Sequence, residues 1–145
     1  MEREDIHKYI ACNLAYLFKA VLLPQLIQIN LINLLKDRDD HGIDKLTLLA
    51  ECPGNHNAIL ADGFERKLFE NEQYSLQYLN ITLLFLRYGS YGNKKKLSSV
   101  KEKVEKLTDD KIMDEMREKY NWDQKKIDEI KDKTQDVLEL IGCNF

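Results

Sequence analysis

The feature that most constrains the fold is the repetition of leucine, isoleucine and aromatic residues every three or four positions along most of the chain. That spacing places apolar side chains on one face of an α-helix, whereas a half-buried strand alternates apolar and polar residues. No segment of the sequence alternates for long enough to indicate a strand. The pattern therefore predicts an all-α fold whose apolar helix faces pack against one another.

Turn and capping residues between the apolar repeats set the expected helix bounds. Helices are expected over residues 4–21, 24–35, 44–51, 58–69, 74–88, 97–107, 109–120 and 123–141. Asn55 or Asn57 is expected to cap the helix at 58–69, Thr108 or Asp109 the helix that reaches Tyr120, and Gly142 to end the last one. The second helix carries too many apolar residues for one stripe, so we expect it to be buried on more than one side.

Composition narrows the class of protein. At 145 residues, of which 43% are hydrophobic, the chain is the size of one domain with its own core. The net charge of -3 and the mixed signs along the chain argue against direct binding of nucleic acid. The longest apolar stretch, residues 14–35, contains Lys19, Pro24 and several amides, which makes it too polar to span a membrane.

Location in the cell follows from two features of the sequence. The first five residues, MERED, do not resemble a secretory signal. Cys12, Cys52 and Cys143 are odd in number and widely spaced, which is typical of free thiols in a reducing compartment. We therefore expect a cytoplasmic protein.

Catalytic motifs are missing from the sequence. It contains no glycine-rich phosphate loop, HExxH, nucleophile elbow or CxxC pair, so we expect no enzyme, no cofactor and no metal. The segment from Cys52 to His56 is the one suggestive cluster, but a zinc site needs further ligands, and a polar loop explains it as well. Paired carboxylates such as Asp39 and Asp40 are interpreted as solvated turn residues.

A basic run and a group of aromatic residues remain. The run of Lys94, Lys95 and Lys96 is interpreted as a solvated helix start whose charge opposes the helix dipole, with contact to a phosphate or an acidic surface as the alternative. The spacing of the aromatic residues around the fifth helix favours core packing. Tyr88 and Tyr91, beside glycines, could instead anchor an interface.

Three stretches resemble a caspase recruitment domain (CARD) of the death-fold superfamily, most closely the first such domain of the RIG-I-like RNA-sensing receptors. They are YIACNL at 9–14 leading into PQLI at 24–27, GNHNAIL at 54–60 ahead of Phe64 and Leu68, and LLFLRYG at 83–89 followed by Leu97. The resemblance implies an antiparallel six-helix bundle over residues 1–100. Residues 101–145 lie outside it and are expected to form a charged amphipathic helical extension packed on the same domain.

The resemblance also implies a function: homotypic death-fold assembly in innate immune or apoptotic signalling, with a CARD-containing adaptor or a second copy as partner. By this analogy the acidic contact side comprises Asp37, Arg38, Asp39, Asp40 and Asp44, and the basic side comprises Arg66, Lys67, Lys94, Lys95 and Lys96. Two other functions remain open from the residues alone. One is a helical carrier of a small lipid-like ligand, and the other is a Bcl-2-like regulator with a groove.

Overall fold

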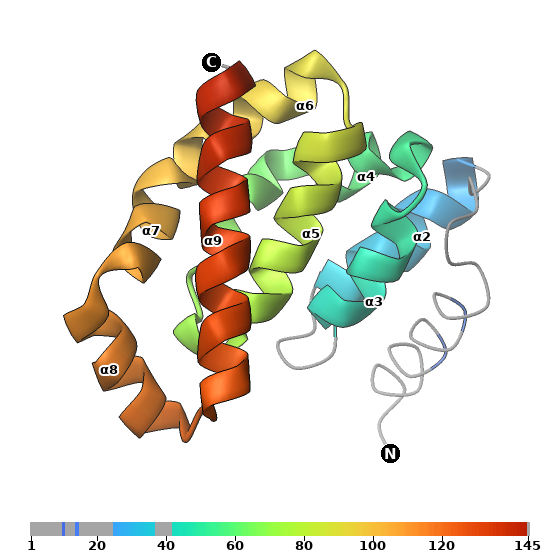
Figure 1. The fold of residues 1–145 in the computed structure, drawn as a ribbon. Coiled ribbons are helices and arrows are strands. Elements are labelled where there is room, and N and C mark those ends of the chain that lie inside the picture. Colours follow the sequence, from blue (N-terminus) through green and yellow to red (C-terminus); the bar gives the residue numbers. More distant parts are fainter. Residues whose placement is uncertain (1–9, 11–13, 15–24, 37–41, 145) are drawn as a thin grey trace. The chain divides into compact units, whose positions relative to one another are not determined.

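The protein is all-α. The structure is a computed structural model that describes residues 10, 14, 25–36 and 42–144; within them it has eight α-helices, several short 3₁₀ helices and no strand (Figure 1). The predicted fold class is thereby confirmed. Of the helix expected over 4–21, only Ile10 and Leu14 are described, both in helical conformation.

Contacts within the chain divide it into two compact units, residues 1–62 and 63–145. Residues 101–145 thus share a unit with residues 63–100, and the domain boundary expected at residue 100 stays a prediction. Each unit is described by itself below.

The described part of the first unit contains α2 (Gln25–Lys36), α3 (Gly42–Ala50), the 3₁₀ helix η1 (Pro53–Asn55) and α4 (His56–Ile59). The helices expected over 24–35 and 44–51 are confirmed with small shifts of their ends. The expectation that α2 is buried on several sides is wrong for Ile29, which is 46% exposed, while Leu31, Ile32 and Leu35 are buried. The Lys36 ammonium joins α2 to the end of α4 by donating to the Ala58 carbonyl at 2.9 Å.

One helix was expected over 58–69, and this prediction is wrong. The α-helix ends at Ile59, and a 3₁₀ helix, η2 (Ala61–Lys67), follows. Asp62, Gly63 and Phe69 have φ values of 60°, 70° and 66°, which a right-handed helix does not accommodate. The apolar spacing of the segment persists, but its backbone leaves the α conformation.

Asn55 occupies the N-cap position of α4, as expected, but its side chain does not cap the helix. Its amide nitrogen instead donates to the Leu49 carbonyl at 3.0 Å, and the residue is fully buried. The side chain therefore gives a hydrogen-bond donor to the last turn of α3, because the carbonyls of a helix's last turn lack partners within the helix.

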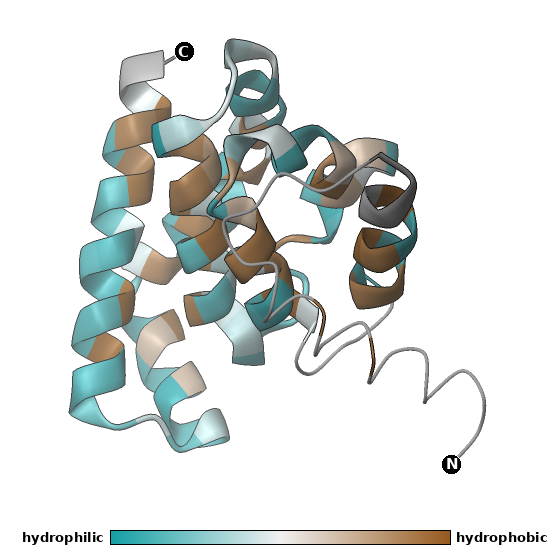
Figure 2. Cartoon of the chain, turned by 90° about the vertical axis from the view of Figure 1, so that its right-hand side faces the viewer, coloured by the Kyte–Doolittle hydropathy of each residue, from teal (hydrophilic) through white to brown (hydrophobic). Residues whose placement is uncertain are grey.

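In the second unit, α5 (Ser75–Tyr88) packs along α9 (Gln124–Asn144). The buried residues of α9 form the predicted stripe, namely Ile127, Ile130, Thr134, Val137 and Ile141, and Figure 2 shows hydrophobic and hydrophilic residues on different sides of this helix. The prediction that Gly142 ends the helix is wrong, because the helix continues to Asn144.

Between these two helices the chain follows a nearly continuous helical path. It runs through α6 (Tyr91–Lys96), η4 (Leu97–Val100), α7 (Lys101–Glu105) and η5 (Lys106–Thr108). The apolar stripe of Leu97, Val100, Val104 and Leu107 is buried as expected, although α and 3₁₀ turns alternate where one helix was predicted.

Helix α8 (Asp110–Tyr120) begins with the predicted cap. One Asp109 carboxylate oxygen accepts from the Lys111 N–H at 2.9 Å and from the Ile112 N–H at 3.4 Å, which satisfies two of the N–H groups that a helix start leaves unpaired.

Candidate functional site

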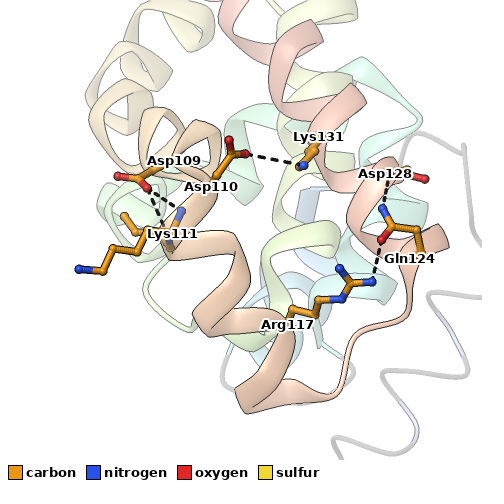
Figure 3. A network of polar contacts seen from close by, with 8 residues as sticks. Asp109, Asp110, Lys111, Arg117, Gln124, Asp128 and Lys131 are labelled. Carbon is orange, nitrogen blue, oxygen red and sulfur yellow. Dashed lines mark hydrogen bonds and ion pairs between the residues drawn. The ribbon is translucent and has the colours of Figure 1, made fainter.

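Helix α8 is held against α9 by a network of polar side chains (Figure 3). The Arg117 guanidinium donates to the Gln124 side-chain oxygen at 2.6 Å, and the Gln124 amide donates to Asp128 at 2.8 Å. Farther along the pair, Lys131 lies 3.8 Å from Asp110. These contacts fix the orientation of α8, because they hold both of its ends to the same partner helix.

The turn from α8 to α9 is built around a buried indole. Asn121 ends α8 in the left-handed conformation with φ 54°, and Trp122 behind it is only 6% exposed. The Tyr120 ring lies 5.5 Å from the Trp122 ring, and the Lys126 ammonium lies 5.2 Å from the indole centroid. Trp122 thus fills the helix junction.

An exposed aromatic and basic surface lies where α5 ends and α6 begins. We define the aromatic–basic surface as Tyr88, Tyr91, Lys94, Lys95 and Lys96. The tyrosines are 61% and 67% exposed, whereas nearly all other large apolar side chains of the described residues are buried or half-buried. Core packing, the favoured interpretation of this aromatic group, is wrong for these two residues, and the interface alternative fits their exposure.

The turn between the two helices places this surface. Gly89 is the C-cap of α5, and the Ser90 hydroxyl caps α6 by accepting from the Asn93 N–H at 3.2 Å. The three lysines therefore lie in the last turn of α6, where positive charge is favourable to the helix dipole. The expectation that they start a helix and oppose its dipole is wrong, because the helix begins earlier, at Tyr91.

The remaining residues of the predicted contact sides are distributed over several elements. Asp44 is exposed in the first turn of α3, within the first unit. Four other members of the predicted acidic side, Asp37, Arg38, Asp39 and Asp40, lie outside the described residues. Arg66 and Lys67 are exposed at the end of η2, on a different element from the lysines of α6.

Arg66 has a local structural role besides its charge. Its guanidinium lies so close to Gly63 that a β-carbon at that glycine would collide with it. The Arg66 carbonyl also accepts a hydrogen bond from the Lys103 ammonium at 2.8 Å, which ties η2 to α7. The Arg66 side chain thus lies over Gly63, whose φ is 70°, and its backbone joins η2 to α7.

A groove of about 560 Å³ lies beside α8 within the second unit, and the sequence did not predict it. We call it the α8 groove and define it by its lining residues: Phe69, Glu70, Glu72, Ser75, Lys103, Lys106, Leu107, Ile112, Glu115, Met116 and Lys119. Its apolar residues include Phe69, Leu107 and Met116, all buried, and six charged side chains surround them. The spacing of Ile112, Met116 and Lys119 along one helix face was the only sequence signal for it.

His56 ends the segment from Cys52 that was considered above as a metal site. The residue is fully buried, and its Nε2 atom lies 2.6 Å from the Ala50 carbonyl oxygen. Burial lowers the pKa of His56 below 6.5, and the hydrogen bond to Ala50 opposes that effect. Among residues 10, 14, 25–36 and 42–144, no group of three or more histidine, cysteine, aspartate or glutamate side chains is placed to hold a metal ion.

Comparisons with known proteins identify no relative. No protein-family model, no curated protein and no solved structure matches the chain. Within the part of the chain that the structure describes, no helix has the length and apolarity needed to cross a membrane.

Proposed function

We propose that this chain is a non-enzymatic protein-interaction domain that assembles with other copies of itself through the aromatic–basic surface. The single observation that carries the proposal is the exposure of Tyr88 and Tyr91, at 61% and 67%, beside a run of lysines. Tyrosine is enriched at the centres of protein interfaces, because its ring contributes a large contact area and its hydroxyl can remain hydrogen-bonded.

The lysines give the surface its preferred partner. Lys95 and Lys96 are exposed, so an acidic partner surface gains both orientation and association rate from them. Contacts of this kind weaken as salt rises, because exposed charges are screened over about 8 Å at physiological ionic strength. The partner surface is therefore expected to carry carboxylates.

A protein partner fits the second unit better than a lipid-like ligand does. The α8 groove is lined by six charged side chains, whereas a carrier of an apolar molecule needs a predominantly apolar cavity. The groove does meet one requirement of a Bcl-2-like regulator, which therefore stays the second candidate function.

The finer proposal is that residues 1–100 adopt a death-fold arrangement of the CARD type, acting in cytoplasmic innate immune or apoptotic signalling. Its support is the resemblance in the three stretches named above, together with the all-α structure. Under this proposal the exposed Asp44 belongs to the acidic side of the contact. The experiment below does not depend on it.

Light scattering after size-exclusion chromatography tests self-assembly directly. The mass of the wild-type protein should rise with concentration at low salt and fall toward the monomer as salt is added. A Tyr88→Ser/Tyr91→Ser variant should stay monomeric at concentrations where the wild type assembles. Circular dichroism should be unchanged, because both side chains are exposed. A wild-type protein that is monomeric at every concentration and salt level would refute the proposal.

A further inference from the structure

We infer that Ser98 is the acceptor of a serine kinase that selects basic substrates, and that its phosphate weakens self-assembly by neutralising lysines of the aromatic–basic surface. This inference rests on the proposed function and names a regulation of the same surface. Three features carry it: the run of lysines shortly before Ser98, the exposure of the Ser98 side chain, and the turn on which its hydroxyl and the lysines lie together.

The lysines before Ser98 form a basic pattern that an acidic kinase cleft recognises. Lys95 and Lys96 stand three and two residues before Ser98, and Lys94 stands four residues before it. Kinases distinguish their substrates partly by the charges around the acceptor, so complementary carboxylates in a kinase attract this segment. None of the three ammonium groups forms an ion pair with another described residue, so their charge is available to the enzyme.

The neighbouring serines fit this chemistry less well. Ser99 is also exposed, but the second residue before it is the buried Leu97. Ser90 follows a single basic residue, Arg87, which is engaged in an ion pair, and the Ser90 hydroxyl caps α6. Ser98 is therefore the serine of this region with the most basic residues directly before it.

The Ser98 hydroxyl lies against the turn that carries the lysines. Ser98 belongs to η4, which continues directly from α6, and its Oγ atom donates to the Lys95 carbonyl at 2.7 Å. Residues three and four positions apart are neighbours on a helical path, so a phosphate on Ser98 lies beside the side chains of Lys94 and Lys95. Their ammonium groups then donate charge-assisted hydrogen bonds to the phosphate oxygens instead of to a partner protein.

The transfer uses a nucleoside triphosphate with Mg²⁺ as the phosphoryl donor. The Ser98 Oγ atom forms a bond to the γ-phosphorus, and the bond from that phosphorus to the bridging oxygen breaks. The hydroxyl proton passes to the catalytic carboxylate of the kinase, and the nucleoside diphosphate leaves. The phosphate carries about -1.5 to -2 charges at neutral pH, so the run of three lysines keeps a net charge of only about +1 to +1.5.

The hydroxyl becomes available when η4 opens locally. Its hydrogen bond to the Lys95 carbonyl must break before the proton can leave. The residues at the two ends of η4, Leu97 and Val100, are 0% and 1% exposed, so opening has a cost. That cost is confined to one turn, because η4 has four residues and the hydrogen bonds of a 3₁₀ helix have poorer geometry than those of an α-helix.

Incubation of the full chain with Mg–ATP and the purified catalytic subunit of cyclic-AMP-dependent protein kinase tests the acceptor, and mass spectrometry locates the phosphate. The wild type and Ser99→Ala should carry phosphate at Ser98, whereas Ser98→Ala should carry none in this segment. Ser99→Ala is the matched control, because the Ser99 hydroxyl is also exposed and donates to the Lys96 carbonyl at 2.9 Å in the same way.

Sedimentation velocity of the purified phosphorylated protein measures the effect on assembly. The association constant at low salt should fall about tenfold, since about two exposed ion pairs are lost and each contributes up to about fivefold. Ser98→Asp should weaken assembly less than phosphate does, because it adds a single charge. Ser98→Asn has nearly the same shape without that charge and should assemble as the wild type does. Circular dichroism checks the fold of each variant.

The outcomes separate this inference from the proposed function. If the folded chain takes up no phosphate at Ser98, or if phosphorylated Ser98 leaves the association constant unchanged, the inference is overturned while the proposed function stands. A loss in Ser98→Asn as large as that in Ser98→Asp also overturns it, because the serine would then act through its hydroxyl and not through charge. If the wild type does not assemble, both are overturned.

Discussion

Replacing two buried threonines by valine should stabilise the protein. Thr82 on α5 and Thr134 on α9 are 0% and 1% exposed, and neither hydroxyl has a hydrogen-bond partner among the described residues. Both lie where the two helices pack, near the contact of Lys133 with the Asn80 side-chain oxygen. We therefore expect Thr82→Val and Thr134→Val each to raise the free energy of unfolding.

The expected size follows from the cost of burying an unpaired hydroxyl, which is about 1–3 kcal/mol. Valine keeps the branched shape of threonine and replaces the oxygen by a methyl group, and the two residues have similar helix propensities. Each substitution should thus contribute about 1 kcal/mol and the pair about 2 kcal/mol. For a chain of this size, 1 kcal/mol corresponds to a rise of roughly 2–8 °C in the melting temperature.

Trp122 provides the assay. It is the only tryptophan of the chain and is buried in the second unit, so its fluorescence during urea unfolding reports on the unit that contains both threonines. Ser75→Ala on α5 is the control, because the Ser75 hydroxyl is also buried but donates to the Glu72 carbonyl at 2.7 Å. That variant should lose about 1 kcal/mol.

The two kinds of substitution should therefore move stability in opposite directions. A loss of about 1 kcal/mol or more in either valine variant, similar to the loss in Ser75→Ala, would show that the threonine hydroxyl is hydrogen-bonded in solution. The argument that these two hydroxyls are buried without a hydrogen-bond partner would then be wrong.

Three further predictions test local features. Burial lowers the pKa of folded His56, so the stability that depends on the neutral imidazole is complete above the unfolded pKa near 6.5 and is lost as pH falls below that value. Urea unfolding followed by circular dichroism should show this loss between pH 7 and 5. The His56→Gln variant should show a smaller change of unfolding free energy with pH. Phe69 has φ 66°, so Phe69→Gly should be more stable than Phe69→Ala by about 1 kcal/mol, with calorimetry as the measurement and equal stability as the contrary result. Asp109→Ala should lose about 1 kcal/mol by thermal unfolding and Asp109→Ser much less, since only the serine retains a cap for α8; equal losses would contradict the cap.

Helix positions were predictable wherever apolar spacing and a strong capping residue coincided. Asp109 before α8 and Gly89 after α5 marked real helix ends, because each acts on the backbone directly beside it. The prediction of one helix over 58–69 was wrong for a related reason. Leu60, Phe64 and Leu68 are buried at helical spacing, yet a 3₁₀ path with positive φ at Asp62 and Gly63 buries them equally well. Periodicity reports which side chains are buried, and several backbones satisfy the same burial.

The candidate surfaces were harder to predict, because exposure depends on the helix on which a residue lies. Tyr78, Phe85 and Tyr88 have similar spacing, but the first two are buried and Tyr88 lies in the last turn of α5. Tyr91 is exposed because Gly89 and Ser90 redirect the chain into α6. The α8 groove depends on contacts between distant segments, with Glu70 and Glu72 opposite α8. Charge runs in the sequence identified Lys95 and Lys96, whereas the α8 groove is assembled only in the folded unit.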